Sequence, residues 1–167
     1  FSTLHTNDAP SAITRLIDMG VKPFLVASSI QAVMAQRLIR VLCKNCKEPD
    51  PNPDPKFLRL TNIGAEDRAS NTIYKSVGCD KCSGTGYKGR QAIFEMMVMD
   101  SVIRDLAFKC AAVEVIRRAA INAGMRSLLE DGKIKILKGT TSPAEIERIA
   151  QVEGVAVLDE ELEPSTV

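Results

Sequence analysis

Two pairs of cysteines place the strongest limit on how this chain can fold. Cys43 and Cys46 form one pair and Cys79 and Cys82 the other, and two residues separate the members of each pair. A Cys-x-x-Cys turn presents two thiolates to one metal ion, and a second such turn completes a tetrahedral set of four. Because four protein ligands leave no open coordination position, the pattern predicts a structural Zn²⁺ site and not a catalytic one.

The spacing of the two pairs separates this pattern from other cysteine chemistry. A thioredoxin-type redox site has one pair beside a βαβ pattern, and the second pair argues against it. The 32 residues between Cys46 and Cys79 exceed the roughly 15–20 residues of a common zinc ribbon, so we expect an inserted sub-structure. Reduced or redox-active cysteines are the alternative. Cys110, the fifth cysteine, follows a helical stretch and is expected to be a buried small hydrophobic residue.

The composition is that of a globular protein and argues against two kinds of partner. Apolar residues make up 45% of the 167 residues and charged residues 26%, which is enough to form a core. The net charge of +1 lacks the basic excess of a non-specific nucleic-acid binder, so we expect no nucleic-acid partner. No apolar run approaches the roughly 20 residues of a membrane-spanning helix. The chain begins at Phe1, and we expect it to be a piece of a longer protein.

Local patterns predict a mixture of helices and strands, and therefore an α/β fold class. Residues 1–6 are β-prone, and Asp8 and Pro10 begin a helix that Gly20 ends. Between the cysteine pairs, we expect a proline-rich loop followed by one short helix and one short strand. The remaining expected elements are a helix at 23–37, strands at 37–42 and 91–99, and helices at 113–124, 125–137 and 142–149, the last beginning with a Ser-Pro-Ala-Glu capping box.

A glycine-rich turn follows the second cysteine pair. Gly84, Gly86 and Gly89 satisfy the G-x-G-x-x-G pattern, but they lead into a β-like segment where a dinucleotide site needs a helix. We therefore expect them to shape the turn. The segment from Cys79 to Gly86 also fits the Cys-x-x-Cys-x-Gly-x-Gly unit of zinc-binding co-chaperones, so a module that binds unfolded proteins is an alternative function. No G-x-x-x-x-G-K-[ST] phosphate-binding loop occurs in the chain.

The single histidine, His5, lies at the end of the β-like segment and just before a helix. Strand ends followed by loops are common places for catalytic groups in α/β proteins. His5 could donate a hydrogen bond to a γ-phosphate or stabilise the charge on a leaving group, and a purely structural role is the alternative. Arg15 lies about 200° around its helix from Ile13, so we expect it to point away from the core.

Four separated segments resemble the ATPases of type II secretion and type IV pilus assembly. The histidine box and its helix are matched by FSTLHTNDAPSAITRLIDMG, and the next helix, the Gln-Arg-Leu run and the first cysteine pair by ASSIQAVMAQRLIRVLCKNC. The second pair and its strand are matched by GCDKCSGTGYKGRQAIFEMM, and the C-terminal helices by GMRSLLEDGKIKILKGTTSPAEI. The resemblance extends from Phe1 to about Ile149, with a variable gap at residues 48–72.

The resemblance implies the C-terminal portion of a RecA-like P-loop ATPase domain, with a zinc-binding insertion and a helical C-terminal region. It implies a homo-hexamer that hydrolyses ATP with Mg²⁺ in the cytoplasm, at the inner membrane. Such a motor moves pilin or pseudopilin subunits through an inner-membrane platform protein, and its attachment to the membrane is peripheral, through partners. Within this family, the cysteine site accompanies extension or secretion motors.

The same resemblance implies roles for particular residues. Thr3 and His5 fall on the histidine box, and His5 takes its active-site role. Arg15 falls on an arginine of the next helix and could approach a nucleotide or a neighbouring subunit, a solvated charge being the alternative. The phosphate loop and the acidic metal-binding motifs are expected before Phe1. The fragment alone should therefore neither bind ATP well nor hydrolyse it.

We therefore expect the chain to comprise four regions. Residues 1–42 are the end of the ATPase core, 43–82 the tetracysteine zinc-binding subdomain, 83–150 a helical C-terminal region and 151–167 a disordered tail. The Asn-Asp-Ala-Pro sequence after the histidine box and the sequence around the first cysteine pair favour pilus assembly, that is pilus extension. The type II secretion ATPase, which powers pseudopilus assembly, is the alternative.

Overall fold

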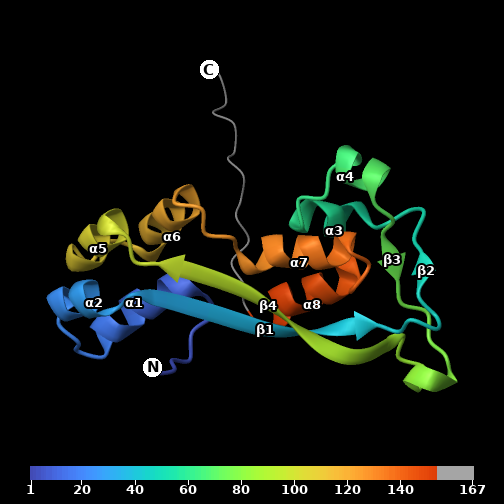
Figure 1. The fold of residues 1–167 in the computed structure, drawn as a ribbon, viewed down its shortest axis with the longest axis horizontal. Coiled ribbons are helices and arrows are strands. Elements are labelled where there is room, and N and C mark those ends of the chain that lie inside the picture. Colours follow the sequence, from blue (N-terminus) through green and yellow to red (C-terminus); the bar gives the residue numbers. More distant parts are fainter. Residues whose placement is uncertain (154–167) are drawn as a thin grey trace.

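The computed structural model describes residues 1–153 as helices arranged around one long antiparallel hairpin (Figure 1). This mixture of helices and sheet agrees with the expected α/β class. The elements in chain order are α1 (Ala9–Asp18), α2 (Pro23–Ser29), β1 (Ala32–Leu42), β2 (Glu48–Pro49), α3 (Pro55–Leu60), α4 (Ala65–Ser70), β3 (Tyr74–Lys75), the 3₁₀ turn η1 (Asp80–Cys82), β4 (Tyr87–Val98), α5 (Ser101–Phe108), α6 (Val113–Asn122), α7 (Leu128–Leu137) and α8 (Pro143–Glu153).

The hairpin of β1 and β4 organises the fold. Its register runs from Ala32 opposite Val98 to Leu42 opposite Tyr87, with an irregularity between Arg40 and Leu42. Figure 1 shows α1, α2, α5 and α6 gathered around the end where β1 begins, and α3, α4 and the β2–β3 ribbon toward the other end. Helices α1, α7 and α8 contact the hairpin directly, so they join the two groups into one hydrophobic core.

The two faces of the hairpin differ in what covers them. Because side chains alternate along a strand, odd-numbered residues share one face and even-numbered residues the other. The odd-numbered face is buried in the core and includes Ala35, Ile39, Ile93 and Met97. The even-numbered face is exposed although it is largely apolar, and its large side chains are Met34, Leu38, Phe94, Met96 and Val98. A contiguous exposed apolar face of this kind is typical of an interaction surface.

The boundary between α2 and β1 differs from the expected one. The sequence predicted a helix over residues 23–37, but α2 ends at Ser29, Ile30 is extended and β1 begins at Ala32. A segment that is apolar on all sides fits a buried helix and a two-faced strand equally well. The cross-strand partner β4 decides between them, and that partner lies about 60 residues further along the chain.

The expected first strand is also absent. Residues 1–6 have no regular secondary structure within the described part of the chain. A strand needs a hydrogen-bonding neighbour, and β1 and β4 pair with each other and not with this segment. The strand predicted at 91–99 is present as β4, although pairing with β1 begins it earlier, at Tyr87.

The helix-capping predictions are largely confirmed. The Asp8 carboxylate accepts a hydrogen bond from the Ser11 N–H at 2.8 Å, and Gly20 ends α1 at φ +89°. Helix α7 begins at Leu128, after a capping box of Ser127 and Glu130, and not at residue 125. The expected tail at 151–167 lies outside the described residues from 154 onward, and α8 itself continues to Glu153.

The predicted capping box of the last helix is only half formed. The Glu145 N–H donates to the Ser142 hydroxyl at 3.3 Å, as expected. The Glu145 carboxylate instead accepts hydrogen bonds from the Arg40 and Arg148 guanidinium groups, and no hydrogen bond from it to the Ser142 N–H is present in the described residues. Two guanidinium groups are stronger partners for a buried carboxylate than one peptide N–H.

The segment between the cysteine pairs forms the expected inserted sub-structure. It contains the two short helices α3 and α4, and β2 and β3 pair as a small antiparallel ribbon. One more helix and one more short strand are present than the sequence predicted. Helix α3 contacts α8, so the insertion packs on the rest of the fold. None of the helices within residues 1–153 combines the length and the apolar character that a membrane span requires.

Candidate metal centre and histidine segment

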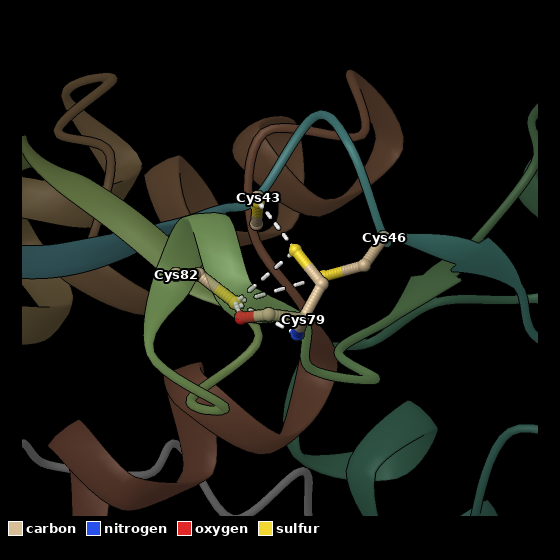
Figure 2. Close-up of side chains that lie close together, drawn as sticks. All are labelled: Cys43, Cys46, Cys79 and Cys82. Atoms are coloured by element: carbon tan, nitrogen blue, oxygen red, sulfur yellow. Dashed lines mark hydrogen bonds between the residues drawn. The ribbon is translucent and has the colours of Figure 1, made fainter.

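The four paired cysteines converge at the end of the hairpin where β1 stops and β4 starts (Figure 2). Their four Sγ atoms all lie within 4.8 Å of one another. The Cys43–Cys79 distance is 4.0 Å, and the Cys46–Cys82 and Cys79–Cys82 distances are both 3.8 Å. Tetrahedral ligation with Zn–S bonds of about 2.3 Å separates the sulfurs by about 3.8 Å. A disulfide needs about 2.05 Å, and all four cysteines are free. The donor set therefore fits a zinc ion.

The hairpin brings the two pairs together across a long stretch of sequence. Cys43 directly follows β1, and its N–H donates to the Gly86 carbonyl at 2.9 Å, which continues the strand pairing beyond Leu42. Cys46 follows in a turn, and its own N–H donates back to the Cys43 carbonyl at 3.2 Å. Cys79 and Cys82 lie at the two ends of η1. Each pair is therefore a local turn, and the strand register places one turn over the other.

Backbone N–H groups prepare one sulfur of the cluster for a metal ion. Burial alone would raise the pKa of the Cys82 thiol, but N–H donors from Cys79 and Gly86, each 3.2 Å from Sγ, help lower this pKa to about 6. Burial and the thiol contacts with Cys79, Cys82 and Cys43 raise the pKa of Cys46 to about 12. Of the four crowded thiols, one is thus favoured as a thiolate. A divalent cation would stabilise the negative charge of the other three sulfurs when they lose their protons.

Two glycines permit the close approach of the chain segments that enter and leave the second cysteine turn. Gly78 has φ +124°, and a Cβ there would lie 2.5 Å from the Gly84 carbonyl oxygen. Gly86 has φ +76°, and a Cβ there would lie 2.6 Å from the Ser76 Cβ. The glycine-rich run leads into β4 and not into a helix. This confirms the turn interpretation of the G-x-G-x-x-G pattern and removes the context that a dinucleotide site needs.

The fifth cysteine takes no part in the cluster, and the prediction that it is buried is wrong. Cys110 is exposed and has φ +52°, directly after the end of α5. Its N–H donates to the Ala107 carbonyl at 3.2 Å, as a residue that ends a helix in the left-handed region does. The chain returns to the core at Ala111, and the Cys110 side chain stays exposed at the turn.

The predicted catalytic residues lie in and after the N-terminal segment. Thr3 and His5 are exposed in residues 1–6, which have no regular secondary structure. Arg15 is exposed on α1, and its orientation away from the core is confirmed. Within residues 1–153, no hydrogen bond or ion pair joins Arg15 to Thr3 or His5. The catalytic roles of these three residues stay predictions.

Sequence reasoning missed a group of charged side chains that hold residues 6–9. Arg37 on β1 donates to the Thr6 and Asn7 carbonyls at 3.1 and 3.0 Å. Glu95 on β4 accepts from the Ala9 N–H at 2.8 Å. One signal was present in the sequence, because Glu95 is the only charged residue in the apolar run IFEMMVM. A lone carboxylate in such a run needs a buried partner.

A buried ion pair completes this group. The Asp8 carboxylate lies 2.8 Å from the Arg117 guanidinium on α6, and their side chains are 5% and 8% exposed. Burial opposes ionisation of Asp8, but hydrogen bonds from Ser11 and Arg117 outweigh it and lower the pKa of Asp8. Burial raises the pKa of Glu95, whose partners are mainly peptide N–H groups. Asp8 is therefore firmly ionised, whereas the charge of Glu95 is less favoured.

Comparison with known proteins identifies the family. The family model described as type II/IV secretion system protein matches residues 1–150. This chain belongs to that family. The type IV pilus assembly ATPase PilB of Thermus thermophilus is 43% identical over 145 residues, which cover 87% of this chain and 16% of the relative. Type II secretion system protein E of Aeromonas hydrophila is 42% identical over 150 residues, which cover 90% and 29%.

A third relative also matches most of this chain. The type II secretion system protein HxcR of Pseudomonas aeruginosa is 45% identical over 150 residues, or 90% of this chain and 28% of the relative. The chain thus spans less than a third of the length of these curated relatives. Relatives from pilus assembly and from type II secretion match it at similar identity, so identity alone does not separate the two systems.

Proposed function

We propose that this chain is the C-terminal part of a hexameric ATPase that drives type IV pilus assembly. The observation that carries the proposal is the family match over residues 1–150, which includes the four cysteines and the histidine segment. Relatives named type IV pilus assembly ATPases support this system, and the type II secretion ATPase is the alternative. The family match also weighs against a zinc-binding co-chaperone module, for which the chain offers one Cys-x-x-Cys-x-Gly-x-Gly unit.

The proposal includes a RecA-like core of which residues 1–42 are the end. The exposed apolar face of the β1–β4 hairpin supports it, since further structure of the same domain would cover that face. In this arrangement residues 43–82 are the zinc-binding subdomain, 83–150 the helical C-terminal region and 151–167 a tail. Zinc, when bound, joins the two cysteine turns and has a structural role.

In the proposed reaction, ATP bound with Mg²⁺ loses its γ-phosphoryl group to water. The exposed His5 side chain is free to donate a hydrogen bond to the γ-phosphate, with Thr3 beside it on the same segment. Arg15 faces outward from α1, as a residue that approaches the nucleotide or a neighbouring subunit must. Because this sequence contains no phosphate-binding loop, we expect the 167-residue chain alone neither to bind ATP well nor to hydrolyse it.

The proposed location is the cytoplasmic side of the inner membrane. The motor would attach there peripherally, through an inner-membrane platform protein, and would need no nucleic-acid partner. The net charge of +1 supports the last point. Deleting the gene and restoring it separates the two systems, because loss of surface pili supports pilus assembly and loss of exported proteins with normal pili supports type II secretion.

The test of the catalytic proposal compares steady-state ATP hydrolysis by the complete ATPase and by its His5→Ala variant. A fall of about tenfold or more corresponds to about 1.4 kcal/mol of transition-state stabilisation and supports the role of His5. His5→Gln keeps an N–H donor and should retain more activity than His5→Ala. Zinc content and assembly must match in all three proteins. Unchanged hydrolysis by His5→Ala would show that His5 is structural, and no hydrolysis by the unaltered protein would contradict the ATPase proposal.

A further inference from the structure

Charged side chains from three distant elements converge on the four residues that follow His5. Arg37 comes from β1, Glu95 from β4 and Arg117 from α6. Their contacts are with consecutive peptide groups and one side chain of residues 6–9. A helix start needs one capping side chain, and Asp8 already provides it through the Ser11 N–H. The additional charged groups therefore do more than cap α1.

Arg37 fixes the direction of the chain as it leaves His5. Its Nη2 atom donates to the carbonyls of two successive residues, Thr6 and Asn7, at 3.1 and 3.0 Å. Its Nη1 atom donates to the Gln36 carbonyl at 2.8 Å, which holds the guanidinium against its own strand. Because the guanidinium is planar and rigid, these bonds restrict both the position and the orientation of the two peptide groups.

Glu95 fixes the next peptide group from the opposite strand. Glu95 is 3% exposed, and its carboxylate accepts a hydrogen bond from the Ala9 N–H at 2.8 Å. The Leu128 peptide at the start of α7 also favours the ionised form of this carboxylate, although burial still raises its pKa. A buried charge of this kind adds little to stability, since desolvation offsets much of its interaction energy. What it adds is a defined position of α1 relative to β4.

The Asp8–Arg117 pair holds the residue between these contacts. Its charged atoms lie 2.8 Å apart and are nearly inaccessible to solvent. The segment from Thr6 to Ala9 is thus held by two carbonyls, one side chain and one N–H, whereas residues 1–5 are exposed. His5 directly precedes Thr6, whose carbonyl is the first held group, and small movements of this residue would displace the imidazole.

We propose that Arg37 and Glu95 are positioning residues, which hold Thr6, Asn7 and Ala9 so that His5 meets the γ-phosphate in a reactive geometry. The inference rests on the proposed function of His5 and extends it to residues that do not touch the nucleotide. Positioning matters because a displacement of about 1 Å from the reactive geometry can lower the rate about a hundredfold. The structure assigns this task to the hairpin, through one residue on each strand.

The first experiment measures kcat and KM for ATP in the complete ATPase carrying Arg37→Met. This change removes the donors to Thr6 and Asn7 and keeps an unbranched side chain. Arg40→Met is the matched control, because Arg40 is on the same strand and binds a buried carboxylate, Glu145, instead of residues 6–9. We expect kcat to fall about tenfold or more with Arg37→Met while KM changes about twofold or less. Arg40→Met should keep kcat within about twofold of the unaltered protein.

Glu95 offers an independent variant in case Arg37→Met does not fold. Glu95→Gln keeps an acceptor oxygen for the Ala9 N–H, whereas Glu95→Leu removes it. We expect Glu95→Gln to keep most of kcat and Glu95→Leu to lose it. A readout besides activity is amide hydrogen exchange, which should rise in residues 3–9 with Glu95→Leu and with Arg37→Met, and not with Arg40→Met.

A double variant separates failure of this inference from failure of the proposed function. If Arg37 acts through His5, Arg37→Met should cause little further loss of kcat in the His5→Ala background. Unchanged hydrolysis by His5→Ala alone would refute the catalytic role of His5. A large loss with His5→Ala, together with normal kcat for folded Arg37→Met and Glu95→Leu, would overturn the positioning role. Equal losses of kcat with Arg37→Met and Arg40→Met would also overturn it, since they would indicate a general structural effect.

Discussion

The two ends of the β1–β4 hairpin are held by different chemistry. At the cysteine end, four thiols from two local turns lie within 4.8 Å of one another and fit a zinc ion. At the histidine end, Arg37, Glu95 and the Asp8–Arg117 pair hold residues 6–9 without any group from outside the chain. We expect a metal ion to stabilise the first arrangement, because its four sulfurs can all be ionised together only beside a cation. The second is complete as the chain folds, so the two ends should respond to different perturbations.

Each end also contains a buried glutamate, and the pKa values of the two shift in opposite directions. Glu145 is fully buried near the cysteine end, where two hydrogen bonds each from the Arg40 and Arg148 side chains outweigh its desolvation and lower its pKa to about 2. Burial dominates for Glu95, and the nearby Asp8 charge adds to it, so its pKa is raised. Burial therefore does not set the direction of the shift by itself, and the charge of the partners does.

Removal of the metal should have the greatest effect, and it should be confined to the cysteine end. We expect the chain expressed with zinc to contain about one equivalent, and a chelator to expose residues 43–86 to hydrogen exchange. Structural zinc sites in small peptides bind with apparent free energies of about 10–16 kcal/mol at pH 7, more than any one side chain contributes.

Cys46→Ser should lose the zinc, and Cys110→Ser is the matched control because Cys110 is exposed and remote from the cluster in sequence. Metal analysis and thermal unfolding of both variants test this. Less than about half an equivalent of zinc in the unaltered chain would contradict the metal assignment.

Breaking the ion pair at the histidine end should have the next largest effect. Arg117→Met leaves the Asp8 carboxylate, 5% exposed, without its guanidinium partner. Breaking a buried pair from one side lowers the free energy of unfolding by about 3–5 kcal/mol. Urea denaturation measures this loss. Arg118→Met on the same helix alters an exposed side chain and should change stability by about 0.5 kcal/mol or less.

The double variant Asp8→Asn/Arg117→Met sharpens this measurement. It removes both charges, so it should be less destabilised than the sum of the two single variants. Additive losses would mean that the 2.8 Å contact between these groups contributes nothing beyond their separate burial.

Acid should destabilise the cysteine end through Glu145. The folded-state pKa of about 2 lies below the ordinary 4.5, so the stabilisation is present above about pH 4.5 and is lost as the pH falls toward 2. Its size is at most about 3 kcal/mol, and less because Arg40 and Arg148 are partly exposed and water screens them.

The measurement is the free energy of unfolding between pH 3 and 6 for the unaltered chain and for Glu145→Gln. The difference in the free energy of unfolding between the two proteins should shrink as the pH falls. Any effect of zinc loss that both proteins share cancels in this difference. For Glu95 the trend should be opposite: the stability of the unaltered chain relative to Glu95→Gln should rise as the pH falls. A raised pKa means that protonation of Glu95 favours the folded chain. Parallel curves for all three proteins would contradict the contrast between the two glutamates.

The smallest effect is expected at Cys110. Its φ of +52° is strained for a residue with a Cβ, and the side chain is exposed, so Cys110→Gly should stabilise the chain by about 0.5–1 kcal/mol. Zinc content should not change. A loss of stability on this change, measured by urea denaturation, would mean that the thiol has a contact which its exposure conceals.

Sequence reasoning succeeded where the interactions are local. The cysteine turns, the Asp8 cap and the Gly20 stop each depend on residues within about four positions of one another, and the structure contains all of them. It failed where a distant partner decides the outcome. Residues 32–36 fit a helix until β4 is placed beside them, and residues 1–6 fit a strand although no strand in the described part of the chain pairs with them.

The sequence by itself determined the two Cys-x-x-Cys turns of a candidate metal site next to a strand, because ligand spacing and turn chemistry are properties of neighbouring residues. Only the tertiary structure decided what the buried charges do. Glu145 and Glu95 are the same residue type in buried positions, but Glu145 has two guanidinium partners, Arg148 nearby and Arg40 at 105 residues' separation. Glu95 instead accepts from the Ala9 N–H, 86 residues away. Electrostatic energies depend on distance in space, and the packing of α8 on β1 and of α1 on β4 sets those distances.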